Sequence, residues 1–424
     1  MPRALNLLAS RRLGPLFWAQ FAGAINDNLL KNALVILVAY REAQEPGGAE
    51  LIVTIATAIF ILPYFLFSAT GGELADKYGK TRLLQSVKLA EIGIMLLAAL
   101  SLALGQIGFQ LAILFLLGVQ ATFFGPVKYA ILPELLATGE LVDGNALIEA
   151  GTFLGILLGT IAGGLLILAP NGIAWTSAAL LLLALGGYGA SRMIPPTGRA
   201  APGLRVDPNI ARTSWAVIRQ AKQRRPVWLA VLGISWFWLV GAALLSQFPN
   251  YAKNYLTADN HVVTLFLAVN SIGVGIGSLL CGRLLRGRIT AKLVPWSALG
   301  MAIFAADLWW ASPAATTAPL VGAWAFLGVA ANWRILGDLF AVALCAGVFA
   351  VPLYVIMQAE SEESSRSRIV AANNILNALF IVAAAAISAL LLKLGSGVPG
   401  IFLAVGLGNA ALAAALWLKA RATT

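Results

Sequence analysis

The chain has 424 residues, of which 60% are hydrophobic and 11% are charged, and its formal net charge is +11. Its mean hydropathy is +0.85, whereas a soluble domain has about 25% charged residues. This composition excludes an ordinary soluble globular protein and indicates a polytopic membrane protein. The cysteines, Cys281 and Cys345, lie in separate apolar segments and indicate neither a disulfide framework nor a metal site.

Apolar segments along the chain predict twelve transmembrane helices. A helix needs about 20 residues to cross the hydrocarbon core of a bilayer, and stretches of that length recur throughout the sequence. The first stretch is too long and too polar in its centre for a signal peptide, and no small-residue cleavage site follows it. We predict spans at 14–40, 51–72, 82–105, 109–131, 146–168, 173–193, 227–248, 262–284, 291–311, 338–358, 369–392 and 398–419.

A polar connector rich in Pro, Gly and Arg divides these spans six and six. It predicts an amino-terminal half at 1–193, a cytoplasmic linker at 194–226 and a carboxy-terminal half at 227–424. The halves resemble each other: FFGPVKYAILPE aligns with VFAVPLYVIMQA, and GNALIEA aligns with ANNILNA. Many secondary transporters consist of paired halves with the substrate path between them. Aligning the first pair of stretches at their prolines matches Pro126 with Pro352, and the second pair matches Asn145 with Asn373 and Glu149 with Asn377.

Most of the 29 Lys and Arg residues lie in loops on one side of the predicted membrane, the side of the amino terminus. The positive-inside rule therefore predicts that both termini are cytoplasmic. The net charge follows from this asymmetry and indicates contact with anionic membrane lipids, not with nucleic acid. Segment 313–336 is apolar, but a thirteenth span would place the carboxyl terminus outside. We predict an outer-face loop or an interfacial helix there.

The stretch AINDNLLKNAL places polar and charged side chains in the middle of the first span. A charge at the centre of a spanning helix costs about 2.5–3.5 kcal/mol on insertion scales. Asp27 and Lys31 are four residues apart and share one helix face, which we predict to line a wet interior, with Asn26 and Asn28 beside it. The alternative is an ion pair within the helix that only lets a polar helix pack.

The stretch GELADKYGK at 72–80 resembles the loop signature of the major facilitator superfamily, and the resemblance extends over all twelve spans. NDNLLKNAL, FFGPVKYAILPEL, LVDGNALIEAGT and SQFPNYAKNYL resemble the bacterial lysophospholipid transporter branch of that superfamily. Its members stand alone or form the transport half of a fusion with an acyltransferase and a ligase. The implied fold is all-α, with twelve transmembrane helices in two pseudo-symmetric six-helix halves.

The resemblance implies a secondary transporter that moves lysophospholipids, and lysophosphatidylethanolamine in particular, across the bacterial inner membrane. Movement would be towards the cytoplasmic leaflet for re-acylation, by alternating access with the head group in a polar central cavity. A cytoplasmic acyltransferase would be a partner, and no cofactor or metal is implied. The coupling ion stays open between sodium and the proton.

A phosphoethanolamine head group carries a phosphate and an ammonium, which lysines and a carboxylate can bind in place of water. If Gly23 is matched with Gly233, the polar residues 26–28 of the first half correspond to the aromatic residues 236–238 of the second half. The acyl chain would then lie against the second half. The alternative is a lipid-facing or packing run. The predicted substrate-binding or ion-coupling residues are Asp27, Asn28, Lys31, Asn26, Lys128, Tyr129, Asn145, Glu149, Asn373, Asn377, Trp236 and Trp238.

In the superfamily, the Asp of the signature loop takes part in a cytoplasmic charge lock, and Asp76 matches it. We predict that Asp76, Lys128 and Glu149 together hold the inside closed. For Lys128 and Glu149, head-group contact and simple interfacial placement stay open as alternatives. The predicted gate consists of Gly72, Asp76, Gly79, Lys80, Lys128 and Glu149.

The sequence contains neither a complete acyltransferase motif nor a complete phosphate-binding loop. The only histidine, His261, is followed by VVTLF and lacks the Asp of an H-x4-D acyltransferase. GKT at 79–81 lacks the glycine that a phosphate loop requires at position 74, where Leu74 stands. Two alternatives stay open. One is a drug/proton antiporter, although the glycine repeat of span five lacks the proline of the corresponding antiporter motif. The other is a non-transporting scaffold for an acyltransferase.

Overall fold

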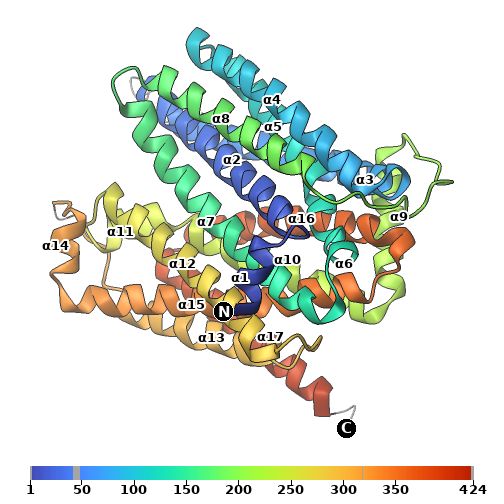
Figure 1. Ribbon diagram of the computed structural model, residues 1–424. Helices are drawn as coiled ribbons and strands as arrows, with labels where there is room; N and C mark the ends of the chain where they lie inside the picture. The colour runs from blue at the N-terminus through green and yellow to red at the C-terminus, as the bar shows by residue number, and fades with distance from the viewer. Residues whose placement is uncertain (1, 42–47, 318, 422–424) are drawn as a thin grey trace.

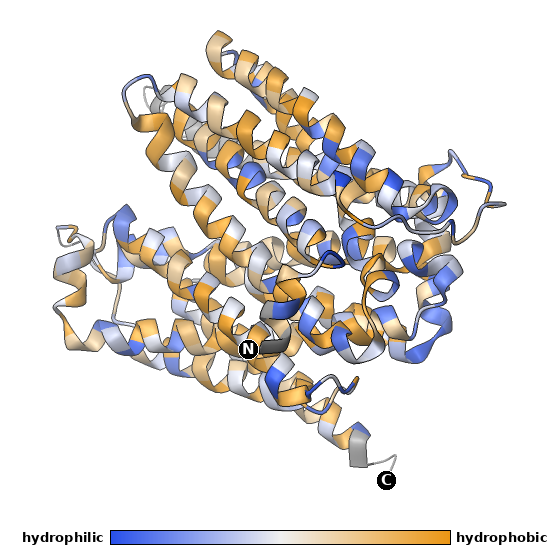
Figure 2. Ribbon diagram, in the orientation of Figure 1, coloured by the Kyte–Doolittle hydropathy of each residue, from blue (hydrophilic) through white to orange (hydrophobic). Residues whose placement is uncertain are grey.

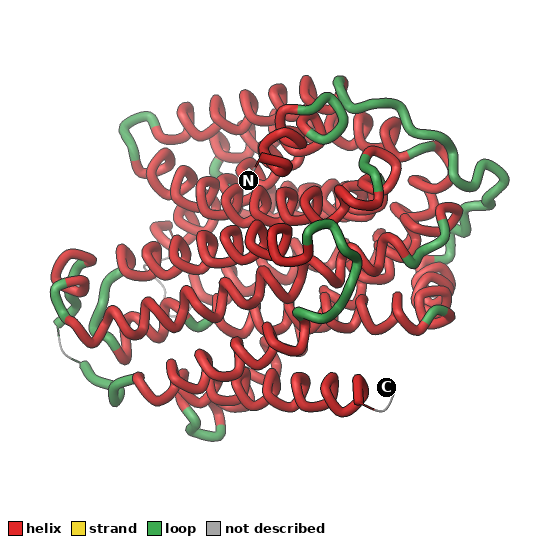
Figure 3. The backbone as a smooth tube through the Cα atoms, turned by 60° about the horizontal axis from the view of Figure 1, so that its bottom comes forward, coloured by secondary structure: helices red, strands yellow, loops and turns green. Residues whose placement is uncertain are grey.

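The computed structural model describes residues 2–41, 48–317 and 319–421. Met1, 42–47, 318 and 422–424 fall outside these ranges, and with them the outermost ends of the predicted halves. Within the described ranges the chain is helical, and its β-pairing is an isolated bridge between Ala258 and Val321 (Figure 3).

Twelve long helices in the described ranges occupy the predicted spans. Ten of them are long and apolar enough to cross a membrane by length and composition. The other two are α2, which carries the polar stretch, and α13, which has 18 residues. The all-α fold with its twelve helices is confirmed. They are α2 (Gly14–Arg41), α3 (Gly48–Tyr78), α4 (Lys80–Leu104), α5 (Ile107–Ala130), α7 (Leu141–Leu168), α8 (Gly172–Arg192), α10 (Arg225–Leu245), α12 (Asn260–Leu285), α13 (Val294–Ala311), α15 (Ala330–Ala359), α16 (Arg366–Lys393) and α17 (Gly397–Arg421).

The first six and the last six long helices form two halves that diverge from one end of the molecule. Figure 1 shows them together near α9 (Ile210–Gln223) and apart towards α11 (Phe248–Tyr255) and α14 (Ala323–Leu327). We call the end with α9 the linker end and the opposite end the far end. Hydrophobic residues dominate the long helices, whereas hydrophilic residues gather at the linker end (Figure 2).

The predicted linker contains a helix that the sequence analysis did not place. Asn209 caps α9, since its side chain accepts a hydrogen bond of 2.9 Å from the backbone N–H of Arg212. The buried face of α9 carries Thr213, Val217 and Ala221 and packs on both α3 and α16. The linker therefore touches both halves at the end where they meet.

Glycines on α7 let α2 approach it closely. A Cβ added to Gly155 would lie 2.8 Å from the Cβ of Ala24, and one added to Gly159 would lie 3.0 Å from the Cβ of Asn28. Such contacts are tighter than a side chain tolerates, so the ridge of small residues is a packing surface. It fixes the rotation of α2 and hence the direction in which the polar stretch points.

The apolar segment 313–336 is divided between two structures. Its first part is loop and the short helix α14, as expected for an outer segment, but α15 begins at Ala330 and not at 338. Asn332 donates from Nδ2 to the Phe326 carbonyl at 2.8 Å, and Trp333 donates from Nε1 to the Leu327 carbonyl at 2.9 Å. These bonds tie α14 to the first turn of α15.

Candidate functional site

A cavity of about 280 Å³ lies between the two halves. Its wall comes from α2, α3, α4, α5 and α7 of the first half and from α10, α15 and α16 of the second. Small-molecule sites span about 300–1,000 Å³, so this volume suits a compact group. The cavity volume is therefore close to the lower end of that range, as a polar head group requires.

The charges that line the cavity all belong to the first half. Asp27 and Lys31 come from α2, Lys88 from α4 and Lys128 from α5. Within the described residues, the second half contributes uncharged side chains to the lining. They are Trp238, Tyr354, Asn374, Asn377, Ala378 and Ile381.

Asp27 and Lys31 face the cavity without pairing to each other. Oδ1 of Asp27 is buried and has no hydrogen-bond partner among the described residues. The Nζ of Lys31 lies 4.3 Å from the ring centroid of Phe60 on α3, and the described side chains form no ion pair within 4 Å between Lys31 and Asp27. A buried carboxylate oxygen requires a bonding partner. The self-contained ion pair considered from the sequence is therefore not formed, and Asp27 can bind a cationic group.

Behind this wall, three donors surround Glu91. Its carboxylate accepts from Lys88 Nζ at 2.7 Å, from Gln120 Nε2 at 2.8 Å and from Asn26 Nδ2 at 3.1 Å. Asn26 was predicted to contact the ligand, but it turns to Glu91 and is absent from the cavity lining. Asn28 does line the cavity, and its Nδ2 donates to the Ala24 carbonyl at 2.8 Å.

Lys128 and Glu149 take different places. Lys128 lines the cavity, where its Nζ donates to Thr152 Oγ1 at 3.3 Å. Glu149 is fully buried outside the lining and accepts a hydrogen bond from the Tyr129 hydroxyl. The Tyr129 ring stacks on Tyr354 of the second half with centroids 4.3 Å apart and planes at 10°. Glu149 thus supports an aromatic contact between the halves.

Three further predicted site residues lie outside the cavity lining. Trp236 is two residues before the lining residue Trp238, so it points about 200° away from it around α10. Its Nε1 donates to Oδ1 of Asn409 on α17 at 3.0 Å. Asn145 exchanges two amide hydrogen bonds of 2.8 Å with Gln358 of α15. Asn373 is buried beside the lining residue Asn374, about 100° away around α16.

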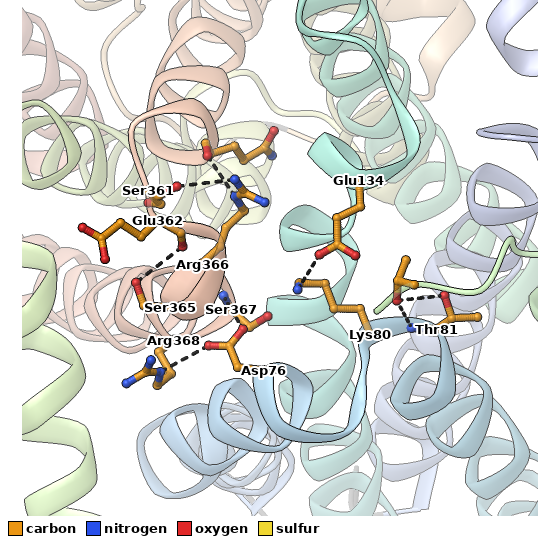
Figure 4. A network of polar contacts seen from close by, with 12 residues as sticks. Asp76, Lys80, Thr81, Glu134, Ser361, Glu362, Ser365, Arg366, Ser367 and Arg368 are labelled. Carbon is orange, nitrogen blue, oxygen red and sulfur yellow. Dashed lines mark hydrogen bonds and ion pairs between the residues drawn. The ribbon is translucent and has the colours of Figure 1, made fainter. Parts of the chain in front are cut away.

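Asp76, a predicted gate residue, contacts other residues than those predicted. Asp76 Oδ2 accepts from Arg368 Nε at 3.2 Å, and Oδ1 accepts from the Ser367 backbone N–H at 3.2 Å (Figure 4). These contacts join α3 to α16 across the halves, so the predicted lock of Asp76 with Lys128 and Glu149 is wrong. The basic partner lies 292 residues away, and nothing in the local sequence marked it.

The remaining gate residues shape the same end. A Cβ on Gly72 would lie 2.8 Å from the Cβ of Ala371, so this glycine lets α3 touch α16. The Nζ of Lys80 lies 2.5 Å from Oε1 of Glu134, which belongs to the short helix α6 (Leu132–Leu135) of the first half (Figure 4). Gly79 has φ +95°, a conformation that favours glycine, at the junction of α3 and α4.

We expect Asp76→Asn to loosen the linker end. Hydrogen bonds to a charged group contribute about 1.5–3 kcal/mol, and a loss of about 1.4 kcal/mol is a tenfold change in an equilibrium. The readout is labelling of Ala371→Cys by a charged maleimide, in a background where Cys281 and Cys345 are alanine. Ala371 is buried against α3, so labelling should accelerate about tenfold.

Glu140→Gln is the matched control for this experiment. Glu140 pairs with Arg12 at 2.8 Å at the same end, but the pair is exposed and stays within the first half. Its loss should leave the labelling of the cysteine unchanged. Equal labelling rates in the Asp76 variant and the unaltered protein would contradict a closing role for Asp76.

Comparison with known proteins agrees with this architecture. The model of the Major Facilitator Superfamily matches residues 16–337. The lysophospholipid transporter LplT of Citrobacter koseri is 28% identical over 424 residues, which cover 95% of this chain and 94% of that protein. LplT of Escherichia coli O9:H4 (strain HS) is also 28% identical, over 98% of this chain and 97% of its own.

Solved structures share the fold. The human organic anion transporter MFSD10 superimposes with a TM-score of 0.75 at 14% identity, covering 95% of this chain and 98% of that one. The transporter FucP in the outward conformation gives 0.67 at 13% identity, with the same coverage. The family match covers most of the chain, and the full-length relatives are transporters, not enzymes. The chain therefore belongs to the major facilitator superfamily and is a multi-pass membrane protein of the secondary-transporter type.

Proposed function

We propose that this protein transports lysophospholipids, with lysophosphatidylethanolamine as its substrate, across the bacterial inner membrane towards the cytoplasmic leaflet. The observation that carries the proposal is the layout of charge in the cavity. One wall presents Asp27 with an unused bonding site together with lysine ammonium groups, and the opposite wall is uncharged. A molecule with a charged head and an apolar body matches this division. Re-acylation by a separate acyltransferase would follow transport.

The head group fits the charged wall by its own charges. Its ammonium pairs with Asp27, and its phosphate pairs with Lys31 and Lys128, which replace the water lost on entry. Thr152, which already accepts from Lys128, holds that ammonium in place. Lipid head groups without a cation would leave the buried Asp27 oxygen unpaired, which is costly.

The acyl chain lies against the second half in this proposal. Trp238 presents aromatic surface there, and Ala378 and Ile381 of α16 continue the apolar lining. The Nε1 of Trp238 donates to the Tyr354 hydroxyl at 3.2 Å, so the polar atom of the indole is satisfied and its ring is available for apolar contact.

Alternating access fits the contacts between the halves. The linker end is held by the Asp76–Arg368 pair, the Asn145–Gln358 amide pair and the Tyr129–Tyr354 stack, whereas the halves diverge towards the far end (Figure 1). With cytoplasmic termini, as the basic loops predict, the far end faces outward. This arrangement would admit substrate from the outer leaflet, and separation at the linker end would release it.

Reconstitution into liposomes tests the proposal directly. Labelled lysophosphatidylethanolamine should cross the bilayer in proteoliposomes several times faster than in protein-free vesicles, with imposed sodium or pH gradients showing which ion is coupled. Lys253→Met is a matched control, because Lys253 is exposed on α11 at the far end and its loss should not change the rate. Failure to move the lysolipid, with an organic cation moving against a proton gradient instead, would establish the drug/proton antiporter.

A further inference from the structure

Besides Lys31 and Lys128, a third lysine, Lys88, lines the cavity. It belongs neither to the polar stretch of α2 nor to the signature loop. It lies on α4, lines the cavity and is 1% exposed. A lysine ammonium carries three hydrogens. Among the described residues its hydrogen bonding goes to Glu91 at 2.7 Å, and its Nζ lies 5.2 Å from the ring centroid of Phe124. Donor capacity therefore remains for a group in the cavity.

Two glycines make the space that Lys88 occupies. A Cβ added to Gly23 of α2 would lie 2.6 Å from the Lys88 Nζ, and one added to Gly187 of α8 would lie 3.3 Å from it. The ammonium from α4 thus passes through a slot between α2 and α8. An ordinary structural ion pair does not require this slot, because a pair between Lys88 and Glu91, three residues apart on one helix, can form on any helix face.

Glu91 sets where this ammonium points. It is fully buried, and its three donors come from α2, α4 and α5, so its position is determined by three helices. Removing one partner of a buried charge pair is strongly destabilising, so the pair with Glu91 holds the Lys88 side chain in place. The pair itself is neutral, yet Lys88 lines the cavity and Glu91 does not.

We propose that Lys88 binds the phosphate of the substrate and that Glu91 is its positioning residue. The inference rests on the proposed function and deepens it. With Lys31 and Lys128, the cavity wall carries three ammonium groups against the single carboxylate of Asp27. Selection then depends on an anionic phosphate as well as on the ammonium. Single-chain amphiphiles that lack a phosphate bind weakly, because they leave Lys31, Lys128 and the remaining donors of Lys88 without an anion in the cavity.

The test is equilibrium binding of two labelled probes to the purified protein. Lysophosphatidylethanolamine carries both the phosphate and the ammonium, and a primary alkylamine of the same chain length keeps the ammonium and lacks the phosphate. The double variant Lys88→Met and Glu91→Gln removes both charges together, so no buried charge is left alone. The amide oxygen introduced by Glu91→Gln can still accept from either Asn26 or Gln120, which donate to different oxygens of Glu91. We expect its affinity for lysophosphatidylethanolamine to fall at least tenfold, with the weaker binding of the alkylamine unchanged. Lys88→Arg should retain discrimination between the probes.

Steric variants provide an independent measurement. Gly23→Ala collides with the flexible end of Lys88 and should weaken binding of the phosphate probe more than Gly187→Ala, whose added carbon meets the same ammonium at a longer distance. Thermal unfolding of each variant reports folding separately. Wild-type protein that discriminates between the probes, with a folded double variant that discriminates equally well, overturns the inference alone. Wild-type protein that does not bind the phosphate probe overturns the proposed function and the inference together.

Discussion

Asp27→Asn abolishes transport and leaves a folded protein: we expect initial uptake of lysophosphatidylethanolamine in proteoliposomes to fall at least a hundredfold. Asparagine keeps the size of the side chain and loses the charge that pairs with the ammonium or with a coupling ion. Folding should survive, because a charge in the middle of a span costs about 2.5–3.5 kcal/mol on insertion scales. The buried Oδ1 of Asp27 has no hydrogen-bond partner among the described residues to lose.

The measurement combines uptake with thermal unfolding in detergent. Glu360→Gln is the matched control, since it also converts a carboxylate to an amide but lies exposed at the linker end. It should transport at the wild-type rate. An Asp27 variant that keeps more than half of the wild-type rate would remove this residue from the binding of both ammonium and ion.

The exchange of charges between Lys128 and Glu149 is expected to leave transport inactive. Each single variant, Lys128→Glu and Glu149→Lys, should lose transport, and the double variant should not recover it. The two positions differ: Lys128 lines the cavity beside Thr152, whereas Glu149 lies behind it and holds Tyr129. A phosphate requires the positive charge at position 128 itself.

The double variant distinguishes a phosphate-binding role of Lys128 from a gate formed by Lys128 and Glu149. If the two residues acted only through mutual attraction, exchanging them would restore that attraction and part of the activity. Lys128→Arg keeps the charge and should retain measurable transport, which controls for the effect of any change at this position. Recovery of activity in the exchanged variant would move Lys128 from the binding site to the gate.

Much of the fold could be predicted because the membrane leaves few choices. Inside a bilayer, backbone groups must bond within their own segment, so an apolar run of about 20 residues becomes a helix. Segments at the membrane surface lack this constraint. The helix α9 and the early start of α15 at Ala330 were missed for that reason, since both depend on packing and on local caps such as Asn209.

Charged site residues could be predicted, because a buried charge is costly. Uncharged ones were misplaced, because their position around the helix axis decides whether they reach the cavity. Asp27, Lys31 and Lys128 stood out because ionised side chains inside spans rarely lack a role, and all three line the cavity. The repeat alignment matched Asn373, but each residue turns a helix by about 100°, and the lining side of α16 carries Asn374 and Asn377. Trp236 and Trp238 were separated in the same way.

The sequence by itself determined the medium, the helices and the charged positions, because hydropathy and the cost of buried charge act locally along the chain. Only the tertiary structure decided which polar side chains meet. Asp76 faces Arg368, Asn145 faces Gln358, and Lys88 reaches the cavity between Gly23 and Gly187. These contacts depend on the rotation and approach of whole helices. Close packing of small residues on α7 against α2 sets part of that geometry, and no single segment specifies it.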